Sequence, residues 1–146
     1  MDKRAMVKPT LTPEMIESGA QLVRELDASK LRPVAAFWLF FPDAEAWKLV
    51  IAERELAKLG PRETYKRIQR VLLSSKEALE LSLADISLRE PKARIVSLLS
   101  KAIGALPGIG GKRFTNNVID GTVIEDAYIY RLPTRRSAAT RQKAQR

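Results

Sequence analysis

The stretch that most constrains the fold runs from residue 112 to residue 132, where two apolar-rich segments flank the dipeptide Asp120-Gly121. Asp-Gly between such segments is among the strongest short-range signals for a β-hairpin, because a type I′ turn needs positive φ at both central residues. A two-residue turn also sets the register, so opposite residues have numbers that add up to 241, the sum of 120 and 121. The sequence therefore predicts two antiparallel strands with a defined pairing.

Successive residues of a strand point to opposite faces of a sheet, so the register assigns every side chain of this hairpin to one of two faces. One face is the more apolar and is predicted to face the core; it holds Lys112, Phe114, Asn116, Val118, Val123, Glu125, Ala127 and Ile129. The other face holds Arg113, Thr115, Asn117, Ile124, Asp126, Tyr128 and Tyr130.

The second face is the predicted binding surface. Its arginine and two tyrosines, Arg113, Tyr128 and Tyr130, offer large contact area with polar ends, as binding surfaces do. Lys112, which directly precedes Arg113, is predicted to contribute to the same binding surface. The alternative interpretation is a half-solvated sheet face in which Arg113 and Asp126 form a diagonal surface ion pair.

The composition narrows the possible chemistry. The chain has no cysteine and no histidine, so disulfides, thiolate nucleophiles and histidine general bases are excluded. The best enzymatic hypothesis is metal-dependent phosphodiester hydrolysis by carboxylates, with Asp126 or Glu125 joined by Asp85 from another strand. Glu125 and Asp126 are adjacent and would point to opposite faces, so they could not share one metal ion. We therefore favour a non-enzymatic protein without a cofactor.

The net charge of +9 is concentrated at the ends of the chain. Residues 131–146 carry six cations and no acid, residues 1–8 have a net charge of +2, and residues 9–130 have a net charge of only +1. The basic C-terminal tail could act as a non-specific electrostatic arm for nucleic acid, or it could simply be a solubilising terminus.

The first half of the chain has clear helix and strand signals. Thr12 before Pro13 is a typical helix start, and the apolar spacing that follows predicts a helix over 13–28. Residues 34–41 are predicted to form a buried strand, followed by a turn at 42–45 and a partner strand at 47–52. A helix over 44–59 is the competing interpretation, because Ala, Glu, Lys and Leu dominate there.

Pro61 is predicted to open a second helix that ends near Leu73. Its outer face carries Arg62, Lys66 and Arg70 four residues apart, so these cations form a basic stripe. The stripe could lie along a phosphate backbone, or it could be an ordinary solvated helix face.

In the second half of the chain, the alternation of apolar residues predicts a third strand over 83–88, and Pro91 is predicted to begin a third helix. The loop Leu106-Pro-Gly-Ile-Gly110 that follows resembles the helix-hairpin-helix of DNA-binding and repair proteins. That resemblance implies a second helix over 111–119 and backbone N–H groups offered to a phosphate, with Lys112 and Arg113 nearby. The alternative is a plain loop between the third helix and the final hairpin.

Together these elements predict a single α+β domain over 12–132 in the order α-β-β-α-β-α-β-β. A mixed or mostly antiparallel sheet of about five strands is expected to carry about three helices on one face. Segment 1–11 is expected to be flexible, and the tail 133–146 disordered.

No apolar run is long enough to span a bilayer and no signal peptide is recognised, so a soluble cytoplasmic protein is expected. The favoured function is a small non-enzymatic binding module, with nucleic acid bound through the final hairpin face and the basic tail. A protein-interaction or self-assembly module is the alternative, and a carboxylate nuclease comes third.

Overall fold

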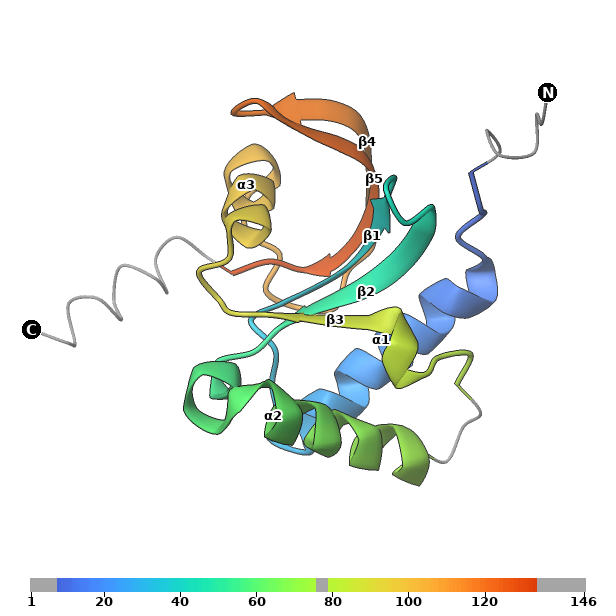
Figure 1. The fold of residues 1–146 in the computed structure, drawn as a ribbon, viewed down its shortest axis with the longest axis vertical. Helices are drawn as coiled ribbons and strands as arrows, with labels where there is room; N and C mark the ends of the chain where they lie inside the picture. Colours follow the sequence, from blue (N-terminus) through green and yellow to red (C-terminus); the bar gives the residue numbers. More distant parts are fainter. Residues whose placement is uncertain (1–7, 76–78, 134–146) are drawn as a thin grey trace, which may run out of the picture.

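The elements of the chain follow one another in the predicted order α-β-β-α-β-α-β-β in a computed structural model, which describes residues 8–75 and 79–133. Most of segment 1–11 and nearly all of the tail 133–146 therefore lie outside the described residues. Figure 1 shows the elements, which are α1 (Pro13–Ala28), β1 (Ala35–Phe41), β2 (Ala46–Ala52), α2 (Glu55–Ser74), the short 3₁₀ helix η2 (Leu83–Asp85), β3 (Ile86–Arg89), α3 (Arg94–Ile103), β4 (Lys112–Ile119) and β5 (Thr122–Arg131).

The five strands form one mixed sheet in the order β3-β2-β1-β5-β4. Strand β3 runs parallel to β2, and the other neighbouring strands are antiparallel. Strand β5, the last of the five in sequence order, lies inside the sheet between β1 and β4. The predicted α+β fold with a mixed sheet of five strands and three helices is therefore confirmed.

The helices cover both faces of the sheet, which corrects the expectation that they lie on one face. Helices α1 and α2 pack on one face and α3 packs on the other (Figure 1). Strand β1 shows the reason, because Trp38 belongs to the cluster with α1 and α2 whereas Phe37 belongs to the cluster with α3, and both are fully buried. A strand that is apolar at every position needs cover on both sides.

Helix α1 begins and ends where the sequence predicts. The Thr12 hydroxyl accepts a hydrogen bond from the Met15 N–H (3.1 Å), and Pro13 occupies the first helical position, where its missing N–H costs nothing. Leu22, Val23 and Leu26 are fully buried against the sheet. The local capping signal and the apolar spacing therefore agree with the packing.

The region 44–59 divides between a strand and a helix. Residues 46–52 form β2, which pairs with β1, so a continuous helix over 44–59 is excluded. The first turn of α2 begins at Glu55, and a kink at Gly60 (φ 83°) separates it from the helix that Pro61 opens. Glycine adopts this left-handed conformation without the steric cost that a side chain would impose.

The third strand is shorter than predicted. Only Ile86–Arg89 pair with β2, whereas Leu83–Asp85 form the 3₁₀ turn η2. The Asp85 carboxylate accepts a hydrogen bond from the Ser82 N–H (2.9 Å) and so caps this turn. Local side-chain capping therefore overrides the alternating pattern of residues 83–85.

The final hairpin has the predicted register, from Lys112 opposite Ile129 to Ile119 opposite Thr122. Asp120 (φ 47°) and Gly121 (φ 80°) both have the positive φ that a type I′ turn requires.

The predicted division of the hairpin into two faces fails near its tip. Asn116 has φ 49°, and the pairing is interrupted there. Ile124 packs in the same cluster as Ala127 and Ile129 although 124 and 127 differ in parity, so the alternation shifts between them. Val118 and Val123, predicted to face the core, are 67% and 68% exposed.

Candidate functional site

Tyr130, predicted as part of a binding face, belongs to the core instead. Its side chain is 1% exposed, and its hydroxyl accepts a hydrogen bond from Trp38 Nε1 (3.0 Å) and donates one to the carbonyl of Ile16 (2.5 Å). Burial raises the pKa of the Tyr130 hydroxyl, so it stays protonated. The expectation that Tyr130 contacts a partner therefore needs correction, because α1 covers this part of the hairpin.

Gly19 on α1 makes this close packing possible. A Cβ built at position 19 would lie 2.8 Å from Trp38 Nε1 and closer still to the Tyr130 hydroxyl. Only glycine lets the helix approach the sheet this closely without a shift. The sequence signal was a glycine inside a helical pattern, which often marks such an approach.

Asp126 binds two cations, Arg113 of the predicted face and Lys8 from the segment before α1. Its carboxylate, on a residue that is 2% exposed, accepts two hydrogen bonds from Arg113, each 2.7 Å, and one from Lys8 Nζ, also 2.7 Å. Burial alone would raise the pKa of this carboxyl, but the bonds from Arg113 and Lys8 outweigh burial and hold it below its usual range. The predicted diagonal pairing of Arg113 with Asp126 is therefore present.

Two aromatic rings complete this cluster. The Arg113 guanidinium lies 5.5 Å from the centre of the Trp47 ring, and Lys8 Nζ lies 5.6 Å from the centre of the Phe40 ring. Cations over ring faces are attracted by the ring quadrupole. Arg113 thus already has a carboxylate partner in Asp126, which it shares with Lys8.

Tyr128 and Lys112 retain partial access to solvent. Tyr128 is half-buried and packs edge-on against Tyr130, with their ring centres 5.5 Å apart. Lys112 is exposed at the start of β4. Ile124, Asp126 and Tyr130 of the predicted hairpin face are buried, whereas Arg113, Thr115, Asn117 and Tyr128 remain at least partly accessible.

The three candidate catalytic acids are not brought together. Asp126 is committed to its two cations, Glu125 is the residue before it on β5, and Asp85 caps η2 beside β3. Strands β3 and β5 are separated in the sheet by β2 and β1. Within residues 8–75 and 79–133, no three acidic side chains are grouped closely enough to hold a metal ion.

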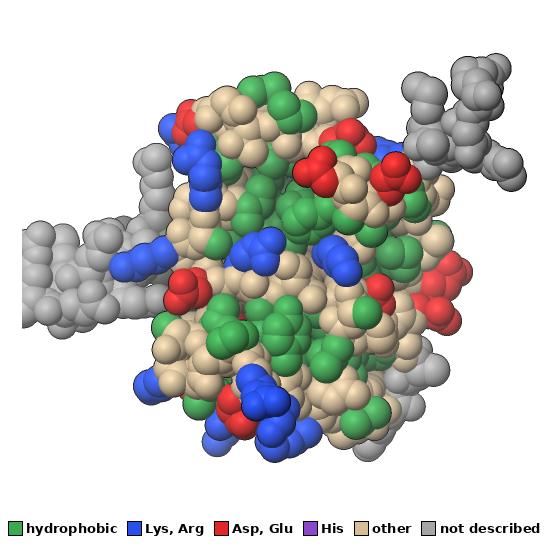
Figure 2. Space-filling view, viewed as in Figure 1, with side chains coloured by type: hydrophobic (Ala, Val, Ile, Leu, Met, Phe, Trp, Pro, Cys, Tyr) green, Lys and Arg blue, Asp and Glu red, His purple; other side chains and the backbone are tan. Residues whose placement is uncertain are grey.

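The basic stripe on α2 is exposed as predicted. Arg62, Lys66 and Arg70 all lie on the solvent side of the helix, and none of them forms an ion pair with a carboxylate of the described residues. Arg67, at the margin of the stripe, pairs with Glu63 at 3.6 Å. Figure 2 shows Lys and Arg side chains gathered over α2, at the bottom of the view.

The loop over 106–110 does not form a helix-hairpin-helix. The residues after it form β4 and not a second helix, so that expectation was wrong. Leu106 forms a β-bridge with Leu132, and Gly110 donates its N–H to the Tyr130 carbonyl (2.8 Å). The loop is a connection held against the sheet, as in the alternative interpretation.

Sequence reasoning missed two buried charged residues. Arg131, counted above with the basic tail, is 4% exposed and forms two hydrogen bonds to the Asp27 carboxylate, of 2.9 and 2.7 Å. Glu53 is 2% exposed, and its Oε2 has no hydrogen-bond partner among the described residues. No sequence pattern singles out Glu53, because charged residues follow it directly at 54 and 55.

Comparisons with known proteins give no identification. No protein-family model, no curated protein and no solved structure matches the chain. Among the described helices, none combines the length and apolar character that crossing a bilayer requires. Functional inference therefore rests on the surfaces themselves.

Proposed function

We propose that the chain is a small non-enzymatic module that binds nucleic acid through the basic stripe of α2, assisted by the basic C-terminal tail. The observation that carries this proposal is the row Arg62, Lys66 and Arg70, exposed on successive turns and without carboxylate partners among the described residues. Four residues of α-helix rise about 6 Å and turn about 40° beyond a full turn, so the three charges form a slanted row along the outer side of the helix. Such a row can follow a phosphate backbone and release its counterions.

The stripe replaces the hairpin face as the principal contact in this proposal. On the hairpin, Tyr130 is buried and Arg113 is paired with Asp126, so these two residues offer less to an anion than α2 does. Lys112 and Tyr128 remain secondary contacts. The tail adds five further cations beyond Pro133, which strengthen attraction without conferring sequence preference.

The test compares three variants that each remove three cations from the full chain. The stripe variant is R62Q/K66Q/R70Q, the tail variant is R135Q/R136Q/R141Q, and the control is K30Q/R32Q/K92Q at exposed positions elsewhere. Binding to labelled single-stranded RNA, single-stranded DNA and duplex DNA is measured by fluorescence anisotropy across a salt series.

The stripe variant should reduce the slope of log affinity against log salt by about 2 to 3, since each lost phosphate contact contributes about 0.7 to 0.9. The control variant should leave that slope nearly unchanged. Equal losses in all three variants, or no binding by the unaltered chain near physiological salt, would contradict the proposal.

Self-association is the second candidate function, and one observation favours it. Val118 and Val123 face each other across the hairpin tip and are both largely exposed. An exposed apolar cross-strand pair is a suitable contact for a second copy or another protein. A mass that rises with concentration in sedimentation, and falls back in V118T/V123T, would support this role.

A further inference from the structure

A hollow of about 300 Å³ lies between the hairpin tip, the first half of α3 and the end of β1. Its apolar lining comes chiefly from Leu39, Phe41, Ile95 and Leu98. Figure 2 shows hydrophobic side chains at the bottom of a hollow beneath the hairpin. The hollow lies on the sheet face that α3 covers, opposite the face that carries α2, so it is independent of the proposed nucleic-acid site.

Two arginines line the same hollow. Arg89 donates hydrogen bonds to the Ser87 hydroxyl (2.6 Å) and the Leu88 carbonyl (3.1 Å), and Arg94 donates one to the Asp120 carbonyl (3.2 Å). All three acceptors are uncharged. Neither guanidinium forms an ion pair with any carboxylate in the described part of the chain. The lining therefore carries two guanidinium groups that are not engaged in ion pairs within the described part of the chain.

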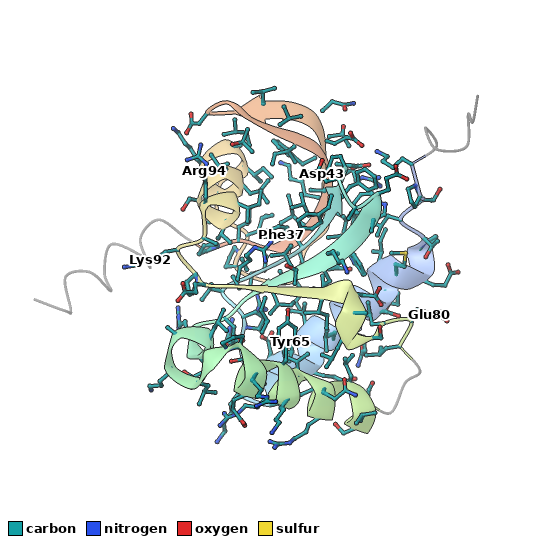
Figure 3. The ribbon with its side chains drawn as sticks, in the orientation of Figure 1. Phe37, Asp43, Tyr65, Glu80, Lys92 and Arg94 are labelled. Atoms are coloured by element: carbon teal, nitrogen blue, oxygen red, sulfur yellow. The ribbon has the colours of Figure 1, made fainter. Side chains whose placement is uncertain are left out.

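The start of α3 adds to this positive potential. Arg94 is the first residue of the helix, and the residue before it is Ala93, whose methyl group cannot accept a hydrogen bond from the first turn. The positive end of the helix dipole thus borders the hollow. In Figure 3, Arg94 lies at α3 beside the hairpin, whereas Lys92 points away from the body of the protein.

We propose that this hollow binds a small organic anion with an apolar body, of the class of medium-chain carboxylates. The apolar chain would lie on Leu39, Phe41, Ile95 and Leu98, and the carboxylate would accept hydrogen bonds from Arg89 and Arg94. A guanidinium presents paired N–H groups that match a carboxylate. The volume is at the lower end of the range for small-molecule pockets, which suits a chain of several methylenes.

The test uses three probes of equal chain length on the full-length protein. Octanoate, octanol and octylammonium carry a negative, a neutral and a positive head on the same tail. Each is titrated into ¹⁵N-labelled protein, and the amide shifts of Ile95, Leu98 and Thr122 report on the hollow. We expect saturable shifts at these amides, with octanoate the tightest probe and octylammonium the weakest.

Two variants separate the charge contribution from the apolar one. R89Q/R94Q should weaken octanoate binding by about tenfold and leave octanol binding unchanged, because only the anion loses charge-assisted hydrogen bonds. Thr122→Phe places a ring in the hollow from β5 and should weaken the binding of all three probes. Both variants change side chains that are not fully buried, and the amide spectrum checks that each one folds.

Three results would overturn the proposal. The first is octanoate binding no tighter than octanol, and the second is R89Q/R94Q leaving octanoate binding unchanged. Shifts scattered over the surface without saturation would indicate an adventitious additive only.

Discussion

Two buried carboxylates with the same exposure have opposite pKa shifts. Asp126 and Glu53 are each 2% exposed. Asp126 has two cations within hydrogen-bond distance, and its pKa is lowered. Glu53 has no hydrogen-bond partner for Oε2 among the described residues, and burial raises its pKa to about 7. At the residue scale, burial raises the pKa of both carboxyls, and the two cations beside Asp126 reverse that shift.

Glu53→Gln should remove a pH dependence of stability. Below pH 4.5 the Glu53 carboxyl is protonated in both states; as pH rises to about 7 it ionises in the unfolded chain but resists ionisation in the folded one. The free energy of unfolding therefore falls as the pH rises from 4.5 to about 7. The loss is complete above pH 7, where it amounts to about 3 kcal/mol. Urea unfolding at pH 5 and pH 8 should show a larger gain for the variant at pH 8.

Glu80→Gln is the matched control for that measurement, because Glu80 is exposed. It should keep the pH dependence of the unaltered chain. If Glu53→Gln keeps it as well, the carboxyl of Glu53 is solvated or paired in solution and the explanation fails.

At the scale of elements, Asn116 decides how the final hairpin bends. Its φ of 49° lies in the left-handed region, which asparagine tolerates better than most residues. The shift in alternation beside it turns Ile124 toward α3 and leaves Val118 and Val123 outside. One residue thereby gives the tip of the hairpin a different buried face from its base.

Asn116→Val should destabilise the chain by about 1 to 2 kcal/mol, since a β-branched side chain is strained at this φ. Asn116→Gly should be nearly neutral, because glycine adopts this conformation freely. Denaturant unfolding of both variants measures the difference. Equal stability of the valine and glycine variants would mean that residue 116 has ordinary strand geometry in solution.

In the final hairpin, the sequence predicts the register of the strands but not which of their faces is buried. The register follows from the Asp120-Gly121 turn, because turn geometry is a local property. The buried face does not follow from it, because the kink at Asn116 shifts the alternation. The burial of Tyr130 was equally hidden, since it depends on α1, more than a hundred residues earlier in the chain. Local chemistry predicted elements, and long-range packing decided which residues remained available for a partner.

At the scale of the whole molecule, Arg131 joins segments that are far apart in sequence. Its guanidinium binds Asp27 at the end of α1, the Pro33 carbonyl (3.0 Å) before β1 and the Gly108 carbonyl (3.1 Å) in the loop after α3. The end of β5 is thus fixed to three other parts of the fold. Arg131, which the charge pattern grouped with the basic tail, therefore helps to hold the fold together.

Asp27→Asn should lower the free energy of unfolding by on the order of 2 kcal/mol, because it leaves the Arg131 charge buried without a counter-charge. Glu17→Gln is the comparison, since it removes an exposed ion pair with Arg24 at 3.6 Å and should cost well under 1 kcal/mol. Thermal unfolding of the two variants measures both effects. Similar small losses in both would show that water or another anion satisfies Arg131.

The central position of β5 has a consequence for the time at which the protein can fold. Strand β1 pairs with β2 on one side, but its other edge must wait for residues 127–131, which are synthesised much later than β1. Until then the nascent chain presents an open edge on a fully apolar strand, the kind of surface that recruits other strands. The interval between making β1 and making β5 is therefore when this chain is most exposed to aggregation, and when a chaperone would protect it most.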